Sequence, residues 1–143
     1  LYLLIAFYIK VVRRDSVLIK RECLTKDGKH FFQYKFNGRH LLIATHLDEL
    51  PQFFNIVKGD MSLVGTRPPT EDEFEQYNSH YRRRISMTPG LTGLWQISGR
   101  SDIVDFDEVV KLDLEYIDNW TVWLDIKILF MTVGAVLKGR GSK

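Results

Sequence analysis

The chain has 143 residues, of which 45% are hydrophobic, so it has room for one domain with a modest core. Its 20 basic residues nearly balance its 18 acidic residues, which argues against a dedicated nucleic-acid-binding protein. The single cysteine, Cys23, excludes an intramolecular disulfide and fits a reducing compartment. The four histidines lack the spacing of metal ligands, which argues against a zinc site.

The chain opens with an apolar run, residues 1–9, and a basic flank that ends at Arg14 follows it. This run is too short to cross a bilayer as a helix, which needs about 20 residues. A signal peptide would carry its positive charge before the apolar run, whereas a basic flank after it stays at the cytoplasmic headgroups. We expect residues 1–14 to be the end of a membrane-associated helix, with a core helix as the alternative.

Two β-prone runs follow, residues 16–22 and 30–36, with a turn at 26–29 between them. The turn contains Asp-Gly, and Asp-Gly between β-prone runs is a strong hairpin signal. The sequence therefore predicts one small β-hairpin.

The stretch from His46 to Pro68 combines two adjacent carboxylates with a helix signal. Pro51 is tolerated only in the first turn of a helix, so Asp48 and Glu49 should lie at its N-terminus. There the partial positive charge of the backbone keeps a carboxylate ionised and attracts phosphate, although Asp is also a frequent simple cap. An apolar face at i, i+3, i+4 and i+7 and a terminating glycine complete the pattern: Leu50, Phe53, Phe54, Val57 and Gly59.

The capping-box pattern from Thr70 to Glu73 predicts a helix that runs to about Arg84. Its acidic start and the three arginines at 82–84 suit the helix dipole. The arginines form either a solvated helix end or an anion-facing patch. One face of this helix would carry Phe74, Tyr77 and Tyr81.

Residues 105–118 predict an amphipathic helix. Asp105 and Asp107 mimic the Asp-x-Asp metal motif of sugar-nucleotide glycosyltransferases, but acidic residues also gather at helix starts. The nearly all-apolar run 126–137 is too short to span a bilayer. Tryptophans before this run and basic residues after it fit a helix at a membrane interface, with a core helix as the alternative. The apolar face of the amphipathic helix would be Phe106, Val109, Val110, Leu114 and Ile117.

The loop at 88–101 contains three glycines, which allow a backbone to approach a ligand closely. Trp95 and Gln96 can stack on and hydrogen-bond a base, and the guanidinium of Arg100 suits phosphate. Residue types alone also fit an ordinary Gly-rich loop.

Two blocks of this sequence resemble the signature of the bacterial sugar transferases, the monotopic polyprenyl-phosphate phosphoglycosyl transferases. LDELPQFFNIVKGDMSLVGTRP at 47–68 resembles the family's LDELPQ and N-x-x-x-GDMSLVG-x-RP. PGLTGLWQISGR at 89–100 resembles PG-[IL]-TGLWQ-[VI]-SGR. The resemblance covers about residue 16 to the C-terminus. It implies an α+β, mostly helical, membrane-associated catalytic core at 15–143 with one small β-hairpin, behind a truncated N-terminal re-entrant membrane helix at 1–14.

The family's reaction moves a sugar-1-phosphate from a UDP-sugar to polyprenyl (undecaprenyl) phosphate, the first membrane step of exopolysaccharide, capsule or O-antigen synthesis. The resemblance implies that Asp48 is the nucleophile of a covalent aspartyl-phosphosugar intermediate, with Glu49 as the assisting carboxylate. A carboxylate that attacks a phosphate anion calls for a divalent cation, and Mg²⁺ on Asp48 and Glu49 is the natural choice.

The same resemblance implies a set of substrate-binding residues and partners. The expected partners are a UDP-sugar, polyprenyl phosphate and membrane lipids, with no nucleic acid and with a homodimer left open. The expected location is the cytoplasmic face of a bacterial cell membrane. The substrate-binding residues would be Arg39, Arg67, Arg84, Trp95, Gln96 and Arg100.

The chain departs from the family pattern in two places. Relatives continue through a sizeable segment after the hairpin, whereas here Asn37 leads directly to Gly38 and Arg39. Ile43 stands where the family commonly has an Arg, and the loss of that cation removes a charge-assisted contact with phosphate. The alternative is therefore a catalytically impaired, membrane-associated homologue with a structural or interaction role. A soluble glycosyltransferase that uses Asp105 and Asp107 is a second alternative.

Overall fold

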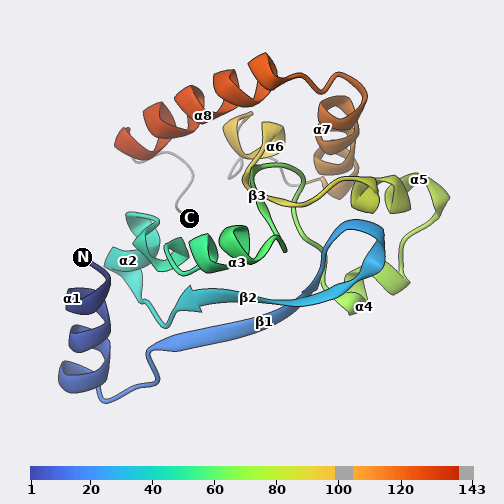
Figure 1. Ribbon diagram of the computed structural model, residues 1–143. Helices are drawn as coiled ribbons and strands as arrows, with labels where there is room; N and C mark the ends of the chain where they lie inside the picture. Colours follow the sequence, from blue (N-terminus) through green and yellow to red (C-terminus); the bar gives the residue numbers. More distant parts are fainter. Residues whose placement is uncertain (99–104, 139–143) are drawn as a thin grey trace.

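A computed structural model describes residues 1–98 and 105–138 of the chain. Helices and two small two-stranded sheets make up the described chain, which confirms the predicted α+β class (Figure 1). No helix within these two ranges is long and apolar enough to cross a membrane. In chain order the elements are α1 (Tyr2–Phe7), η1 (Tyr8–Val12), β1 (Leu18–Leu24), η2 (Lys26–Gly28), β2 (His30–Phe36), α2 (His40–Ala44), η3 (Leu47–Glu49), α3 (Gln52–Lys58), β3 (Ser62–Val64), α4 (Glu71–Glu75), α5 (Ser79–Arg82), η4 (Arg83–Ser86), β4 (Gly90–Thr92), α6 (Leu94–Ile97), α7 (Phe106–Asp118) and α8 (Val122–Leu137).

The predicted hairpin is confirmed. Strands β1 and β2 pair antiparallel, with Leu18 opposite Phe36 at one end and Leu24 opposite His30 at the other. The turn between them contains Gly28 at a φ of 79°, a left-handed conformation that glycine adopts without strain. Figure 1 shows the hairpin beneath α3, with α1 at its open end.

The N-terminal helix packs on the hairpin through one face. Ile5 and Ile9 are buried against Phe36, and the Tyr2 hydroxyl donates a hydrogen bond to the Leu50 carbonyl. The opposite face is apolar and exposed, and Leu3 keeps 84% of its surface accessible. The segment thus has a core-facing side, while its association with a membrane stays a prediction.

A second sheet joins the two sequence blocks and was not predicted. Strands β3 and β4 are parallel, with Ser62 opposite Gly90 and Val64 opposite Thr92. Strands of three residues are too short to show an alternation of apolar and polar residues, and the glycines around them are typical of a loop. A Cβ on Gly90 would lie 2.0 Å from the backbone nitrogen of Gly65, so the close approach allowed by Gly90 is to another strand rather than to a ligand.

The predicted helix from Thr70 to Arg84 is wrong as a single element. Its capping box is present, because the Thr70 hydroxyl accepts from the Glu73 amide and the Glu73 carboxylate accepts from the Thr70 amide. The chain leaves the helix after α4, and Asn78 then caps the separate helix α5 by accepting from the Tyr81 amide. Asn competes with the helical hydrogen-bond pattern in this way, which explains the break.

The two C-terminal helices are confirmed, and α8 begins four residues earlier than the predicted apolar run. Val110 and Leu114 of α7 are buried, while Asp105 caps the helix by accepting from the Asp107 amide. This contact supports the reading of the Asp-x-Asp pattern as a helix start. In α8 only one side faces the core, where Ile128 packs near Val64 and Tyr116.

Candidate active site

Helix α3 is held against strand β2 by a buried polar side chain. The amide nitrogen of Asn55 donates to the Phe32 carbonyl at 2.6 Å, and its amide oxygen accepts from the Tyr34 backbone at 3.1 Å. Gln52 accepts from Gln33 of the same strand at 3.1 Å. These contacts satisfy both halves of the Asn55 amide and fix the distance between the helix and the hairpin.

The predicted apolar face of α3 therefore points away from the hairpin. Phe54 and Val57 are 58% and 87% exposed, whereas Gln52 and Asn55 are buried. The periodicity located the helix correctly, but polar contacts with β2 determine which side of it is buried.

The carboxylates Asp48 and Glu49 lie on η3, a single 3-10 turn immediately before α3. Pro51 is the N-cap of α3 rather than a residue of its first turn, and Leu50 and Pro51 continue the right-handed helical backbone between the two elements. In the described part of the chain no side chain caps either element, so Asp48 is not a simple cap.

Glu49 forms an ion pair with Lys35 of the hairpin. The Lys35 Nζ lies 3.1 Å from Glu49 Oε1, and both side chains are partly exposed, at 33% and 16%. Lys35 follows Gln33 on the same face of β2, because side chains alternate along a strand. The hairpin thus places a cation beside Asp48 and Glu49, which are called the dyad below.

Burial raises the pKa of Asp48, Lys35 opposes this shift, and Glu49 adds to it. The expectation that a helix N-terminus holds this carboxylate in its ionised form was therefore incomplete. The loss of water outweighs the backbone dipole of one short turn. Gly38 contributes to the burial, since a Cβ on Gly38 would lie 3.4 Å from Asp48 Cβ.

A polar cavity of about 60 Å³ lies beside Glu49. Three cationic side chains line it: Arg21 and Lys35 from the hairpin and Arg67 from the loop after β3. Trp95 and Gln96 of α6 line it as well. The fold therefore brings together three predicted substrate-binding residues, Arg67, Trp95 and Gln96, with the predicted catalytic residue Glu49.

The sequence reasoning missed Arg21 and Lys35 as site residues. Both were assigned to the hairpin, and no local pattern connected the hairpin with the dyad. The available signal was the resemblance to the family, which covers about residue 16 to the C-terminus and therefore includes the hairpin.

Of the other three predicted substrate-binding residues, two lie elsewhere and one falls outside the described residues. Arg39 is exposed and is not among the residues that line the polar cavity. Arg100 lies outside the described residues. Arg84 is buried, with Nε and Nη2 donating to Asp113 Oδ2 at 2.8 and 2.6 Å and Nη1 donating to the Tyr77 hydroxyl at 2.8 Å. Arg84 thus joins η4 to α7 in the core and does not line the polar cavity.

Burial raises the pKa of Asp113 to about 6, although the Arg84 guanidinium opposes this shift. Asp113 belongs to α7 and Arg84 to η4, so this pair joins two parts of the core. The neighbouring Arg83 is exposed and pairs with Asp118 at 2.5 Å. The arginine triplet is therefore split between the interior and the surface.

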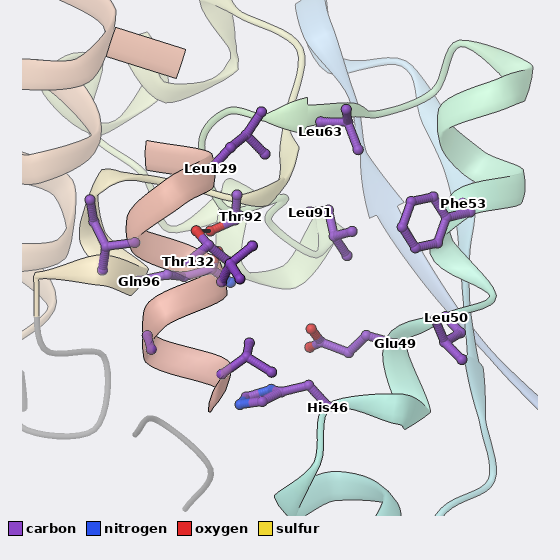
Figure 2. Close-up of a pocket in the computed structure, with 14 residues that line it drawn as sticks. His46, Glu49, Leu50, Phe53, Leu63, Leu91, Thr92, Gln96, Leu129 and Thr132 are labelled. Atoms are coloured by element: carbon purple, nitrogen blue, oxygen red, sulfur yellow. Dashed lines mark hydrogen bonds between the residues drawn. The ribbon is translucent and has the colours of Figure 1, made fainter. Parts of the chain in front are cut away.

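An apolar groove of about 270 Å³ adjoins the other side of Glu49. Figure 2 shows His46 and Glu49 pointing across this groove toward α8. Glu49 and Gln96 line both the groove and the polar cavity, so they form the boundary between the two. The apolar side chains come from α3, β3, β4 and α8 and their flanks: Leu50, Phe53, Leu63, Leu91, Leu129, Val133 and Val136.

Asp48 and Glu49 are neighbouring carboxylates on η3, and carboxylate oxygens are ligands that Mg²⁺ takes, so Mg²⁺ at these two residues stays a prediction. Adjacent oxygen ligands suit a hard cation that keeps several waters. Elsewhere in the described ranges, Glu22, His30 and Glu71 hold ligand atoms within 4.8 Å of one another. That group is exposed, and ordinary ion pairing of His30 with the two glutamates explains it.

Comparison with known proteins identifies the family. The family model described as bacterial sugar transferase matches residues 37–139. The galactosyl transferase CpsE of Streptococcus agalactiae is 65% identical over 139 residues, which covers 92% of this chain and 31% of CpsE. The undecaprenyl-phosphate galactose phosphotransferase of Salmonella typhimurium is 54% identical over 98 residues, which covers 68% of this chain and 20% of that protein.

The sugar transferase EpsL of Bacillus subtilis is similar over most of its own length. It is 37% identical over 163 residues, which covers 96% of this chain and 80% of EpsL. That aligned length exceeds the 143 residues of this chain, so EpsL has residues that the chain lacks. The chain spans less than a third of CpsE and of the Salmonella protein. With a family match over most of its length and these relatives, the chain belongs to the bacterial sugar transferase family.

Proposed function

We propose that the chain transfers a sugar-1-phosphate from a UDP-sugar to polyprenyl (undecaprenyl) phosphate. The observation that carries this proposal is the position of Glu49, between a cavity with three cations and an apolar groove. A nucleotide sugar is anionic and suits the polar cavity, while an isoprenoid chain is apolar and suits the groove. The names of two relatives include undecaprenyl phosphate, which supports the lipid side of this division.

The reaction proceeds in two displacements at one phosphorus atom. Asp48 attacks the phosphorus that carries the sugar, an aspartyl O–P bond forms, and the bond to the departing UMP breaks. An oxygen of polyprenyl phosphate then attacks the same phosphorus and releases Asp48. Burial raises the pKa of Asp48, which makes its carboxylate more basic and a better nucleophile.

The cations of the polar cavity reduce the repulsion between the carboxylate and the donor. Lys35 is 3.1 Å from Glu49 and therefore close to the dyad, while Arg21 and Arg67 line the same cavity. When bound at Asp48 and Glu49, Mg²⁺ would supply further neutralisation of the phosphate charge. Glu49 holds Lys35 in place.

A membrane location also belongs to this proposal. Exposed apolar side chains lie on α1, α3 and α8, including Leu4, Phe54, Trp123 and Phe130 at 58–78% exposure. Monomeric soluble proteins seldom expose so many large apolar residues, and a lipid surface would cover them. The acceptor lipid would then enter from the cytoplasmic leaflet. The re-entrant character of residues 1–14 and a homodimer stay predictions.

The impaired homologue is the competing proposal, because Ile43 replaces a cation. Ile43 is 46% exposed at the end of α2. The three cations that line the polar cavity favour the active enzyme, since they supply positive charge beside the dyad without residue 43. An assay of UMP release from the UDP-sugar, with Mg²⁺ and a lipid acceptor present, separates the active enzyme from the impaired homologue. The absence of turnover would support the impaired homologue.

Trapping of the intermediate tests the nucleophile. Two relatives are named for galactose transfer, so galactose is the first sugar to test, and incubation with sugar-labelled UDP-galactose should leave label on Asp48 in the absence of acceptor. Asp48→Asn should fold normally, trap no label and lose several orders of magnitude of turnover. Asp107→Asn is the matched control and should trap label normally, because Asp107 lies at the start of α7. Label on another residue, or loss of label in Asp107→Asn, would overturn the assignment.

A further inference from the structure

A third cavity, of about 500 Å³, shares no lining residue with the groove. Four aromatic side chains line it: Tyr77, Tyr81, Trp95 and Phe106. Arg67 and Trp95 line both this aromatic cavity and the polar cavity, so the two adjoin. Its volume lies in the range of about 300–1,000 Å³ that is typical of small-molecule sites.

Three of the rings form one connected wall. The centroids of Tyr77 and Tyr81 are 5.8 Å apart, and the Phe106 centroid is 5.9 Å from Tyr77 and 5.4 Å from Tyr81. The buried Arg84 guanidinium lies 5.8 Å from the Tyr77 centroid and 5.3 Å from that of Phe106. Its hydrogen bond to the Tyr77 hydroxyl and its pair with Asp113 fix the wall from below.

Arg67 lines both the aromatic cavity and the polar cavity, and its partner Glu73 lines the aromatic cavity. Arg67 donates to both oxygens of Glu73, at 3.3 and 3.2 Å, so the carboxylate is oriented before any ligand binds. A ligand that spans the junction would meet Arg67 with an anionic group and Glu73 with hydroxyl donors. Aromatic faces beyond them would cover a flat ring.

We propose that the aromatic cavity binds the nucleobase and ribose of the nucleotide donor, an inference that rests on the proposed function. The base would stack on the aromatic wall, and Glu73 would accept from the ribose hydroxyls. Arg67 would contact the diphosphate as it enters the polar cavity. The donor would thus reach Glu49 from the aromatic side, while the acceptor approaches from the groove.

The position of the cations supports this order. Arg21, Lys35 and Arg67 line the polar cavity, between the aromatic wall and the dyad, where a diphosphate would have to lie. The groove on the other side of Glu49 is lined mainly by apolar side chains. A purely apolar ligand in the aromatic cavity would leave the Arg67–Glu73 pair without a role in its recognition.

Tyr81 offers the sharpest test, because it is only partly buried while Tyr77 is buried among core contacts. Tyr81→Ala should weaken UMP binding and raise the donor KM about tenfold or more, since removal of one stacking ring has this order of effect. Binding of inorganic pyrophosphate and kcat at saturating donor should stay within about twofold. Tyr81→Phe should bind UMP like the wild type because the ring remains.

Phe53→Ala is the matched control, since Phe53 is an exposed aromatic residue of the groove. It should leave UMP binding unchanged. Thermal unfolding of each variant establishes that it is folded. Unchanged UMP binding in Tyr81→Ala, equal weakening of UMP and pyrophosphate, or failure of the wild type to bind any nucleoside monophosphate would overturn the inference.

Calorimetric binding of UMP requires no turnover, so failure of the inference and failure of the proposed function can be distinguished. If the wild type binds UMP through Tyr81 but transfers no sugar phosphate, the transferase proposal fails and the nucleoside site stands. If the wild type transfers sugar phosphate and Tyr81→Ala binds UMP as tightly as the wild type, only the assignment of the nucleoside site is wrong.

Discussion

The Lys35–Glu49 and Arg84–Asp113 ion pairs use similar chemical groups in very different surroundings. Lys35 and Glu49 are 33% and 16% exposed and line a cavity, whereas Arg84 and Asp113 are 0% and 1% exposed. The Lys35 Nζ lies 3.1 Å from Glu49 Oε1, while Arg84 donates to one Asp113 oxygen through two nitrogens. Solvent access is the main difference between them.

This difference separates a binding role from a structural one. A partly exposed ion pair contributes little to stability and can exchange its partner for a phosphate at small cost. A buried pair cannot open without leaving an uncompensated charge in the core. We therefore expect changes at Lys35 and Glu49 to affect activity, and changes at Arg84 and Asp113 to affect folding.

The largest expected effect is the loss of stability on breaking the buried Arg84–Asp113 pair. Arg84→Met leaves Asp113 buried without its cation, so the free energy of unfolding should fall by about 3–5 kcal/mol. Urea denaturation measures this loss. The double variant Arg84→Met/Asp113→Leu removes both charges and should recover much of it. If the double variant is as unstable as the single one, the pair is not the cause.

Glu49→Gln should lower activity and leave stability nearly unchanged, which is the reverse of the effect expected for Arg84→Met. The amide still accepts from Lys35 but carries no charge, so turnover should fall by about 10²–10³-fold, as for removal of one preorganised electrostatic group. The urea midpoint should stay near that of the wild type because the pair is partly exposed. A folded protein with unchanged turnover would remove Glu49 from the catalytic residues.

Lys35→Met should shift the pH dependence of activity. Lys35 lowers the pKa of Asp48, which burial raises, so its loss should raise that pKa further. The nucleophile must be ionised, and the acidic limb of kcat/KM should therefore move to higher pH. Lys20→Met on the exposed strand β1 is the control and should leave the limb in place. A limb that moves to lower pH would contradict the assignment.

The smallest effect on stability is expected for the exposed Arg83–Asp118 pair. Arg83 and Asp118 approach to 2.5 Å, but their side chains are 48% and 54% exposed. Arg83→Ala should change the free energy of unfolding by less than about 1 kcal/mol, because solvent screens such pairs. A loss as large as that of Arg84→Met would show that distance, rather than burial, separates these pairs.

Much of the candidate site was predictable from the sequence. Asp48 and Glu49, together with Arg67, Trp95 and Gln96, were identified from two sequence blocks, and the fold places Glu49 with the last three around one cavity. Arg84 was also predicted to bind substrate, but its burial places it beneath the aromatic wall. A run of three arginines gives no local signal for which of them is buried.

The sequence by itself determined the elements whose signals lie between near neighbours. The Asp27-Gly28 turn specifies the hairpin, the Thr70 and Glu73 capping box begins α4, and Gly59 ends α3 with a φ of 88°. Each depends on backbone conformations and hydrogen bonds within a few residues. These interactions form in the same way whatever the rest of the chain does.

Only the tertiary structure decided how these elements face one another. Asn55 pairs with the backbone of β2 more than 20 residues away, which turns the apolar face of α3 outward. Gly65 and Gly90 allow β3 and β4 to pair across 25 residues. Lys35 reaches Glu49 only through these long-range contacts. Burial depends on which distant segments meet, and no local pattern in a sequence encodes that choice.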